Sequence, residues 1–229
     1  MVSTRVVMTS LVSALLLAPL IQAQDLSMYR QFQFGMNLAE VAKRAEVKPS
    51  VARIIHQRPA LIEELEWRPQ RSYDSSKETD PVREVLFSFY NGELFRMLVT
   101  YDADKTQGLT QQDMVEAISA IYGTASTPDA QIILFSSSSV YNNSEKVIAR
   151  WEDPQYSVNL FRVSYNSAFG IAAFSKRLDA LAGKAINEAI RLDAKEAPER
   201  EIQRQKKEDD ANRLAQDKAR PGNKANFRP

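Results

Sequence analysis

The sequence predicts an α+β protein in which two similar units, each a short helix followed by antiparallel strands, form or share a sheet. Three observations predict this class. A capped helical pattern occurs twice, alternating apolar runs follow each copy, and an amphipathic segment comes after both. Helices that alternate with runs of short strands favour packing of the helices against an antiparallel sheet.

The chain begins with a pattern typical of a secretory signal peptide. Arg5 precedes the apolar run from Val6 to Ile21, and Ala23 offers a small residue for cleavage. The run is shorter than the ~20 residues that span a bilayer as a helix. We therefore expect residues 1–23 to be removed, the mature chain to have no transmembrane helix, and the protein to be exported to the periplasm or secreted.

Composition narrows the classes of function. The chain has 30 Lys and Arg against 29 Asp and Glu, no cysteine, and one histidine, His56. Balanced charge gives no reason to expect nucleic acid as a partner. The lack of cysteine excludes a thiol nucleophile and Cys-ligated metal sites, and His56 is the single candidate for a histidine general base. Composition therefore favours a role without catalysis and without a cofactor.

Two short helices are expected where the sequence repeats itself. Residues 35–41 (GMNLAEV) recur in kind as residues 108–114 (GLTQQDM). Asn37 and Thr110 suit an N-cap, and the acid three residues later can bond back to the cap and favour the helix dipole. Gly123 is a natural stop for the second helix. The shared order of elements after each helix favours an internal duplication.

Antiparallel strands are expected after each helix. In the first unit, residues 24–102, the runs 82–90 and 93–101 flank the Asn91-Gly92 pair, which is the strongest short signal for a two-residue hairpin. In the second unit, residues 103–178, strands are expected at 131–135, 146–151, 156–165 and 168–175.

The C-terminal part is expected to be helical at first. Residues 179–197 carry one apolar stripe, which predicts a helix on or beside the sheet. Pro198 would end this helix or begin another. Residues 198–229 are a charged tail with too few large apolar residues to bury a core, so we expect a solvated helix or disorder.

One segment resembles a DNA-binding motif. Residues 41–55 resemble the helix-turn-helix of LacI-type repressors, whose second helix enters the major groove. Glu46 stands where the family's turn carries Gly, the following stretch is one residue short, and an exported protein does not meet operator DNA. DNA binding is a lesser alternative, and no nucleic-acid partner is expected.

Two further alternatives rest on carboxylates. Asp102, Asp104 and Thr106 occupy positions of an EF-hand-like loop, and Asp113 lies at its last position, but Gln107 stands where the loop needs glycine. A polar turn is the favoured interpretation, and a calcium-dependent envelope module is the alternative. Abundant acids also allow a carboxylate-based hydrolase, although sequence spacing cannot show a catalytic pair.

A short pattern is shared by the two units: a Gly-apolar-[Asn/Thr] start, a capped helix, and strands with a tryptophan. The residues that carry it are Gly35, Met36, Asn37, Val41 and Trp67, then Gly108, Leu109, Thr110, Met114, Gly123 and Trp151. Over about residues 32–178 this pattern resembles the module of the SmpA/OmlA (BamE-like) outer-membrane-assembly lipoproteins and the tandem module of the β-lactamase inhibitory proteins. The lipobox Cys is missing. The resemblance implies a binding module of the cell envelope.

The sequence therefore predicts an exported, non-catalytic module that binds another envelope or secreted protein. Aromatic side chains near predicted bends are the candidate contacts, because Trp and Tyr are enriched among residues that dominate binding energy. These candidates are Trp67, Tyr73, Tyr141, Trp151 and Tyr156. The alternative role of each is hydrophobic core.

Overall fold

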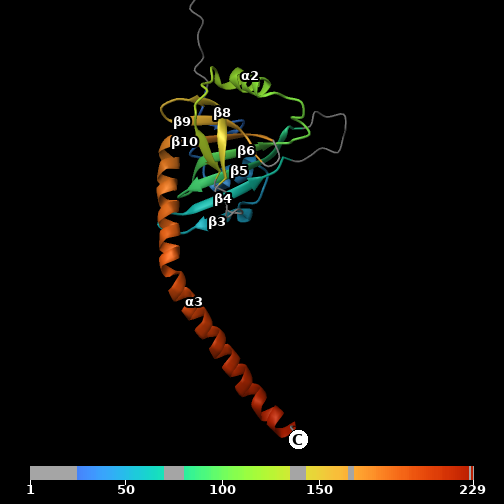
Figure 1. Cartoon of the computed structure of the whole chain (residues 1–229), viewed down its shortest axis with the longest axis vertical. Helices are drawn as coiled ribbons and strands as arrows, with labels where there is room; N and C mark the ends of the chain where they lie inside the picture. The colour runs from blue at the N-terminus through green and yellow to red at the C-terminus, as the bar shows by residue number, and fades with distance from the viewer. Residues whose placement is uncertain (1–24, 70–79, 135–142, 165–167, 227, 229) are drawn as a thin grey trace, which may run out of the picture.

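The computed structural model describes residues 25–69, 80–134, 143–164, 168–226 and 228 (Figure 1). It confirms the α+β class, with antiparallel sheets, two short helices and one long C-terminal helix. The first half contains β1 (Met28–Tyr29), β2 (Phe32–Gln33), α1 (Leu38–Arg44), the 3-10 turn η1 (Pro49–Val51), β3 (Arg53–His56), β4 (Ile62–Trp67), β5 (Val82–Tyr90) and β6 (Glu93–Tyr101). The second half contains α2 (Gln111–Tyr122), β7 (Gln131–Leu134), β8 (Asn143–Glu152), β9 (Tyr156–Arg162) and β10 (Phe169–Ser175), and α3 (Lys176–Asn226) follows.

The main sheet has eight strands in the order β3-β4-β5-β6-β10-β9-β8-β7, and all neighbours are antiparallel. Each half therefore places a helix before a four-strand meander, and the last strands of the two meanders pair with each other. This pairing of β6 with β10 makes one continuous sheet from the two halves. The repeated element order is compatible with the hypothesis of an internal duplication.

Both predicted helix caps are confirmed. The Asn37 side chain accepts from the Glu40 backbone N–H at 2.9 Å, and the Glu40 carboxylate accepts from the Asn37 N–H at 3.0 Å. Thr110 and Asp113 form the same reciprocal pair at 3.1 and 2.7 Å, and Gly123 ends α2. Each box satisfies backbone donors that the first turn of a helix leaves unpaired.

The predicted hairpin is also confirmed. Asn91 and Gly92 have φ of 49° and 84°, and they connect the paired residues Tyr90 and Glu93. Two consecutive positive φ values are what a type I′ turn requires, and its twist matches that of the flanking strands.

The two faces of the sheet are covered differently. On one face, Phe32 of the β1–β2 hairpin, Val41 of α1 and Ile118 of α2 pack on strand residues to form the main core. The opposite face carries a smaller cluster in which Leu178 and Ala182 of α3 contact strands β4 and β6. Figure 1 shows α3 running beside the sheet from β10 to β3 and then continuing away from it.

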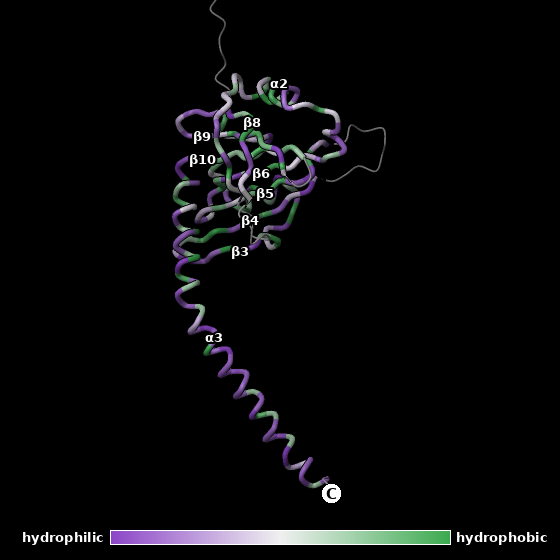
Figure 2. Tube along the Cα trace, viewed as in Figure 1, coloured by the Kyte–Doolittle hydropathy of each residue, from purple (hydrophilic) through white to green (hydrophobic). Residues whose placement is uncertain are grey.

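The structure corrects the expected end of the last helix. Pro198 lies inside α3, which continues to Asn226. Proline removes one backbone donor, but Arg200 spans this point and donates to both the carboxylate and the backbone carbonyl of Asp193, at 2.8 and 3.1 Å. A proline also bends a helix, and α3 changes direction partway along its length (Figure 1). The lower part of α3 is mostly hydrophilic (Figure 2).

The helix-turn-helix interpretation is wrong. After α1 the chain forms only the η1 turn and then β3, so no second helix stands where a recognition helix would be. Pro49 begins η1, and the β-branched Ile54 pairs with Glu63 of β4. Residues that the DNA-binding interpretation required in a helix therefore form a β-strand, which β-branched residues favour. Among the described residues, no helix combines the length and the apolar character needed to cross a bilayer.

Candidate functional site

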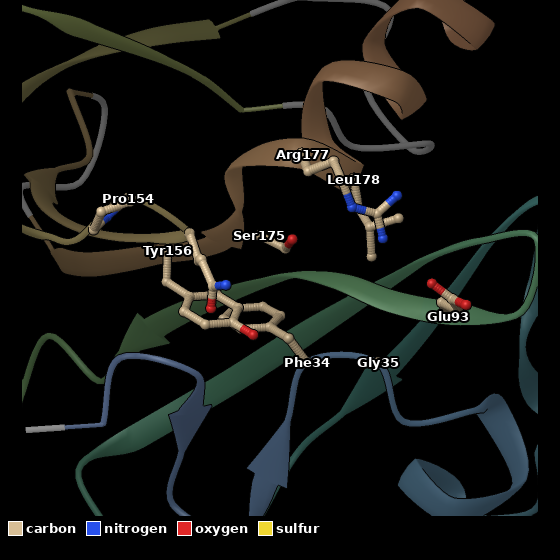
Figure 3. A pocket seen from close by; sticks show the side chains of 9 residues that line it. Phe34, Gly35, Glu93, Pro154, Tyr156, Ser175, Arg177 and Leu178 are labelled. Atoms are coloured by element: carbon tan, nitrogen blue, oxygen red, sulfur yellow. The ribbon is translucent and has the colours of Figure 1, made fainter.

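A hollow of about 350 Å³ lies where the two halves of the chain meet the start of α3 (Figure 3). Its walls come from the link between β2 and α1, the first residue of β6, the turn between β8 and β9, and the junction of β10 with α3. The lining residues are Phe34, Gly35, Glu93, Pro154, Gln155, Tyr156, Ser175, Arg177 and Leu178.

Backbone hydrogen bonds fix the wall of the hollow that comes from the first half of the chain. The Gly35 N–H donates to the carbonyl of Leu94 at 2.9 Å, and the Leu94 N–H donates to the carbonyl of Met36 at 2.8 Å. These bonds hold the segment after β2 against the beginning of β6. Glu93, which directly follows the Asn91-Gly92 turn, is thereby placed at the rim of the hollow.

The opposite wall is a turn organised by one carboxylate. Asp153 accepts from the backbone N–H groups of Gln155 and Tyr156, both at 2.6 Å. The Lys176 N–H then donates to the carbonyl of Gln155 at 2.9 Å, which ties the turn to the first residue of α3. Asp side chains commonly organise turns in this way. The position of Tyr156 therefore follows from local hydrogen bonds.

The start of α3 is anchored to the sheet by two ion pairs. The Arg96 guanidinium on β6 donates to Asp179 through Nε at 2.8 Å and Nη2 at 2.5 Å. Lys176 pairs with Glu152 at 2.7 Å. These contacts lie on either side of Arg177 in sequence, and they fix the helical turn that carries its side chain.

Stacked aromatic rings form one side of the hollow. Phe34 and Tyr156 have ring centroids 5.4 Å apart and planes inclined by 12°. Figure 3 shows the two rings beside each other, one from each half of the chain. Phe34 is buried, whereas Tyr156 is partly exposed and packs against the main core. A partly exposed, rigidly held ring is the kind of surface that interfaces use.

Two opposite charges stand at the same opening. Glu93 and Arg177 are both exposed and both line the hollow. Within the described part of the chain, neither side chain forms an ion pair or a hydrogen bond. In Figure 3 the Arg177 guanidinium and the Glu93 carboxylate lie on the same side of the hollow, away from the aromatic rings.

The predicted contact residues are distributed between core and hollow. Tyr156 lines the hollow. Trp151 is only 1 % exposed, and its Nε1–H donates to the carbonyl of Gly123 at 3.0 Å, so it is held in the core. Trp67 is partly buried against Phe32, with centroids 5.3 Å apart. Tyr73 and Tyr141 lie outside the described residues.

The candidate calcium ligands have other roles. Asp102 accepts from the Asp104 N–H at 3.0 Å, and the Thr106 hydroxyl donates to the Asp102 carbonyl at 2.9 Å, which is a polar turn. Asp113 belongs to the cap of α2. Over the ranges that the structure describes, no group of three or more acidic, histidine or cysteine side chains is arranged to hold a metal.

A second hollow, of about 480 Å³, is lined by Tyr29, Tyr101 and Tyr122. Burial raises the pKa of Tyr29, raises that of Tyr101 well above its ordinary value, and raises that of Tyr122 to about 12. Arg30 binds Asp80 through hydrogen bonds of 2.7 and 2.8 Å, and these bonds lower the pKa of the Asp80 carboxyl. The three phenols therefore stay protonated at neutral pH, and the cation is already paired.

The chemistry of the first hollow suits recognition. Its lining contains one carboxylate, Glu93, whereas the hydrolase alternative needs a convergent pair. Sequence reasoning found Tyr156 but missed Phe34, Glu93 and Arg177. The hairpin turn could have placed Glu93 at an exposed strand end, but no local signal brings it near Arg177.

Comparison with known proteins adds no relative. No protein-family model matches the chain, and neither the curated proteins nor the solved structures gave a significant match.

Proposed function

We propose that this protein is an exported, non-catalytic module that binds another protein of the envelope or secreted fraction, with the hollow around Tyr156 as its contact. The observation that carries the proposal is the partly exposed Tyr156 ring, stacked on Phe34 beside two charges that have no partner in the described chain. Aromatic and arginine anchors surrounded by a polar rim are typical of protein interfaces.

The sequence supports the same proposal independently. The signal-like first 23 residues favour export. The short pattern that resembles the SmpA/OmlA and β-lactamase inhibitory modules, whose use is binding, favours the same role, and both halves have the helix-then-strands order that this pattern predicts. Function resides in a site rather than in a fold, so the experiment addresses the hollow directly.

A photo-crosslinking residue placed at Gln155, on the wall of the hollow, tests the contact. We expect light-dependent capture of one protein from the native envelope or secreted fraction by the mature chain. The matched control carries the same crosslinker at Lys105, which is exposed and does not line this hollow. Capture should weaken roughly tenfold in Tyr156→Ala. No adduct at Gln155, or equal adducts at both positions, would contradict the proposal.

Export is tested separately. The N-terminal residue of the protein recovered from the exported fraction should lie near Gln24. An intact precursor that remains in the cytosol would contradict the proposed location.

A further inference from the structure

The hollow presents two charges of opposite sign that are free to bind. Glu93 comes from the first residue of β6, and Arg177 comes from the first turn of α3. Two other cations near the start of α3 are already paired: Arg96 binds Asp179, and Lys176 binds Glu152. Within the described chain, Glu93 and Arg177 bind neither each other nor another side chain.

We propose that the hollow recognises a protein segment in which a lysine or arginine lies next to an acidic residue. This inference rests on the proposed function and names the chemistry of the partner. The acidic side chain binds the Arg177 guanidinium, and the basic side chain binds the Glu93 carboxylate.

The lining of the hollow gives each charged side chain of the bound segment its own partner. Guanidinium presents a planar set of donors that matches a carboxylate. The aliphatic stem of a lysine or arginine packs on apolar and aromatic surface while its charged end stays in water, and the partly exposed Tyr156 ring, stacked on Phe34, offers such a surface across the hollow from the two charges (Figure 3). A volume of about 350 Å³ lies at the small end of ligand pockets, which suits one or two side chains.

Exposed ion pairs are individually weak. The proposed recognition should therefore appear as a modest difference in affinity between peptides that carry the two charges and peptides that lack one of them. We expect each correct pair to change affinity by roughly two- to fivefold. Both differences should shrink at high salt, because solvent-exposed charges are screened.

The test is an NMR titration of the mature protein with blocked dipeptides. Acetyl-lysyl-glutamyl amide should bind more tightly than acetyl-lysyl-glutaminyl amide and acetyl-glutaminyl-glutamyl amide. Arg177→Gln should remove the preference for the acidic residue only, and Glu93→Gln should remove the preference for the basic residue only. Glu93 and Arg177 are both exposed, so the two variants should fold, and their NMR spectra will show whether they do.

Matched controls separate the site from general electrostatics. Arg83→Gln and Glu116→Gln remove one exposed charge of each sign outside the hollow, and both should keep the preferences. Equal binding of the three peptides, or equal losses in the controls, would overturn the inference.

The two proposals fail differently. If the Gln155 crosslinker captures a partner equally well in Arg177→Gln and Glu93→Gln, the protein binds a partner but the charge pairing is wrong. If the dipeptide preferences hold and no partner is captured, the pairing stands and the proposed function is wrong.

Discussion

At the scale of single residues, close packing makes one glycine costly to replace. Gly170 on β10 lies against the ring of Phe161 on β9, and a Cβ added there would be 2.4 Å from the ring's Cζ. Phe161 is only 1 % exposed, so its ring has little room to move. We expect Gly170→Ala to destabilise the fold by about 1–3 kcal/mol, the usual cost of overpacking, as measured by urea unfolding.

The matched control is another glycine in a different setting. Gly183 lies within α3, and nothing stands within 4 Å of a Cβ added there. Alanine is favoured over glycine in a helix by about 0.5–1 kcal/mol, so Gly183→Ala should stabilise the protein. A similar loss in both variants would show that the Phe161 contact does not determine the effect.

The buried tyrosines make stability depend on alkaline pH. Burial raises the pKa of Tyr122 to about 12 and also raises that of Tyr29 and Tyr101, whereas unfolded phenols ionise near pH ~10. The contribution of these tyrosines to the free energy of unfolding is complete below pH ~10. It is lost as the pH rises toward the pKa values of the folded state, because the unfolded state then binds fewer protons than the folded state. Urea midpoints should therefore fall above pH ~10.

Tyr122→Phe checks this assignment. It removes a hydroxyl that donates to the Met28 carbonyl at 3.0 Å, so the variant should be less stable at neutral pH. Its stability should then decline less steeply above pH ~10 than that of the wild type. An unchanged slope would exclude Tyr122 as one of the responsible groups.

At the scale of elements, α3 combines two kinds of helix. Its first part buries Leu178, Ala182, Ala185 and Ala189, whereas all residues from 197 to 226 except Asp210 are exposed. The exposed part is supported by local ion pairs such as Glu201–Arg204 at 2.7 Å and Asp210–Arg213 at 3.0 Å. Such pairs support helices locally and are weakened by salt.

Truncation after Ala197 separates the two parts. The shortened chain keeps the packing of α3 on the sheet and the ion pair of Glu196 with Arg58 of the β3–β4 connection, so its melting temperature should change by no more than about 2 °C. Circular dichroism of the full chain should lose helical signal in 1 M NaCl, and the truncated chain should not. A large fall in melting temperature would mean that the exposed part stabilises the body.

At the scale of the whole molecule, the two halves share one core. Val85 and Met97 of the first half and Trp151 and Ile171 of the second belong to the same buried cluster. Pairing of β6 with β10 also joins the halves through the sheet. Separation would expose this cluster, so we expect a single cooperative unfolding transition.

The two tryptophans make this testable, because each half contains one. Trp151→Phe leaves Trp67 as the fluorescent reporter of the first half, and Trp67→Phe leaves Trp151 as that of the second. In each variant the urea midpoint from fluorescence should coincide with that from circular dichroism. Midpoints that differ between the signals would show that the halves unfold independently.

Prediction succeeded where neighbours in sequence interact. The Asn37 and Thr110 caps and the Asn91-Gly92 hairpin depend on residues at most three positions apart, so composition and spacing suffice. The strand β3 was missed because Arg53–His56 is short and lacks strict alternation, and its strand state depends on pairing with β4.

Local sequence by itself determined the α+β class, both capped helices and the central hairpin, because each depends on short-range hydrogen bonding and on the spacing of apolar residues. Only the tertiary structure decided that Trp151 is buried and that Tyr156 lines a hollow. It alone brought Glu93 and Arg177 to one opening. Those placements depend on the pairing of β6 with β10, a contact between segments distant in sequence that forms when the two halves bury a common core.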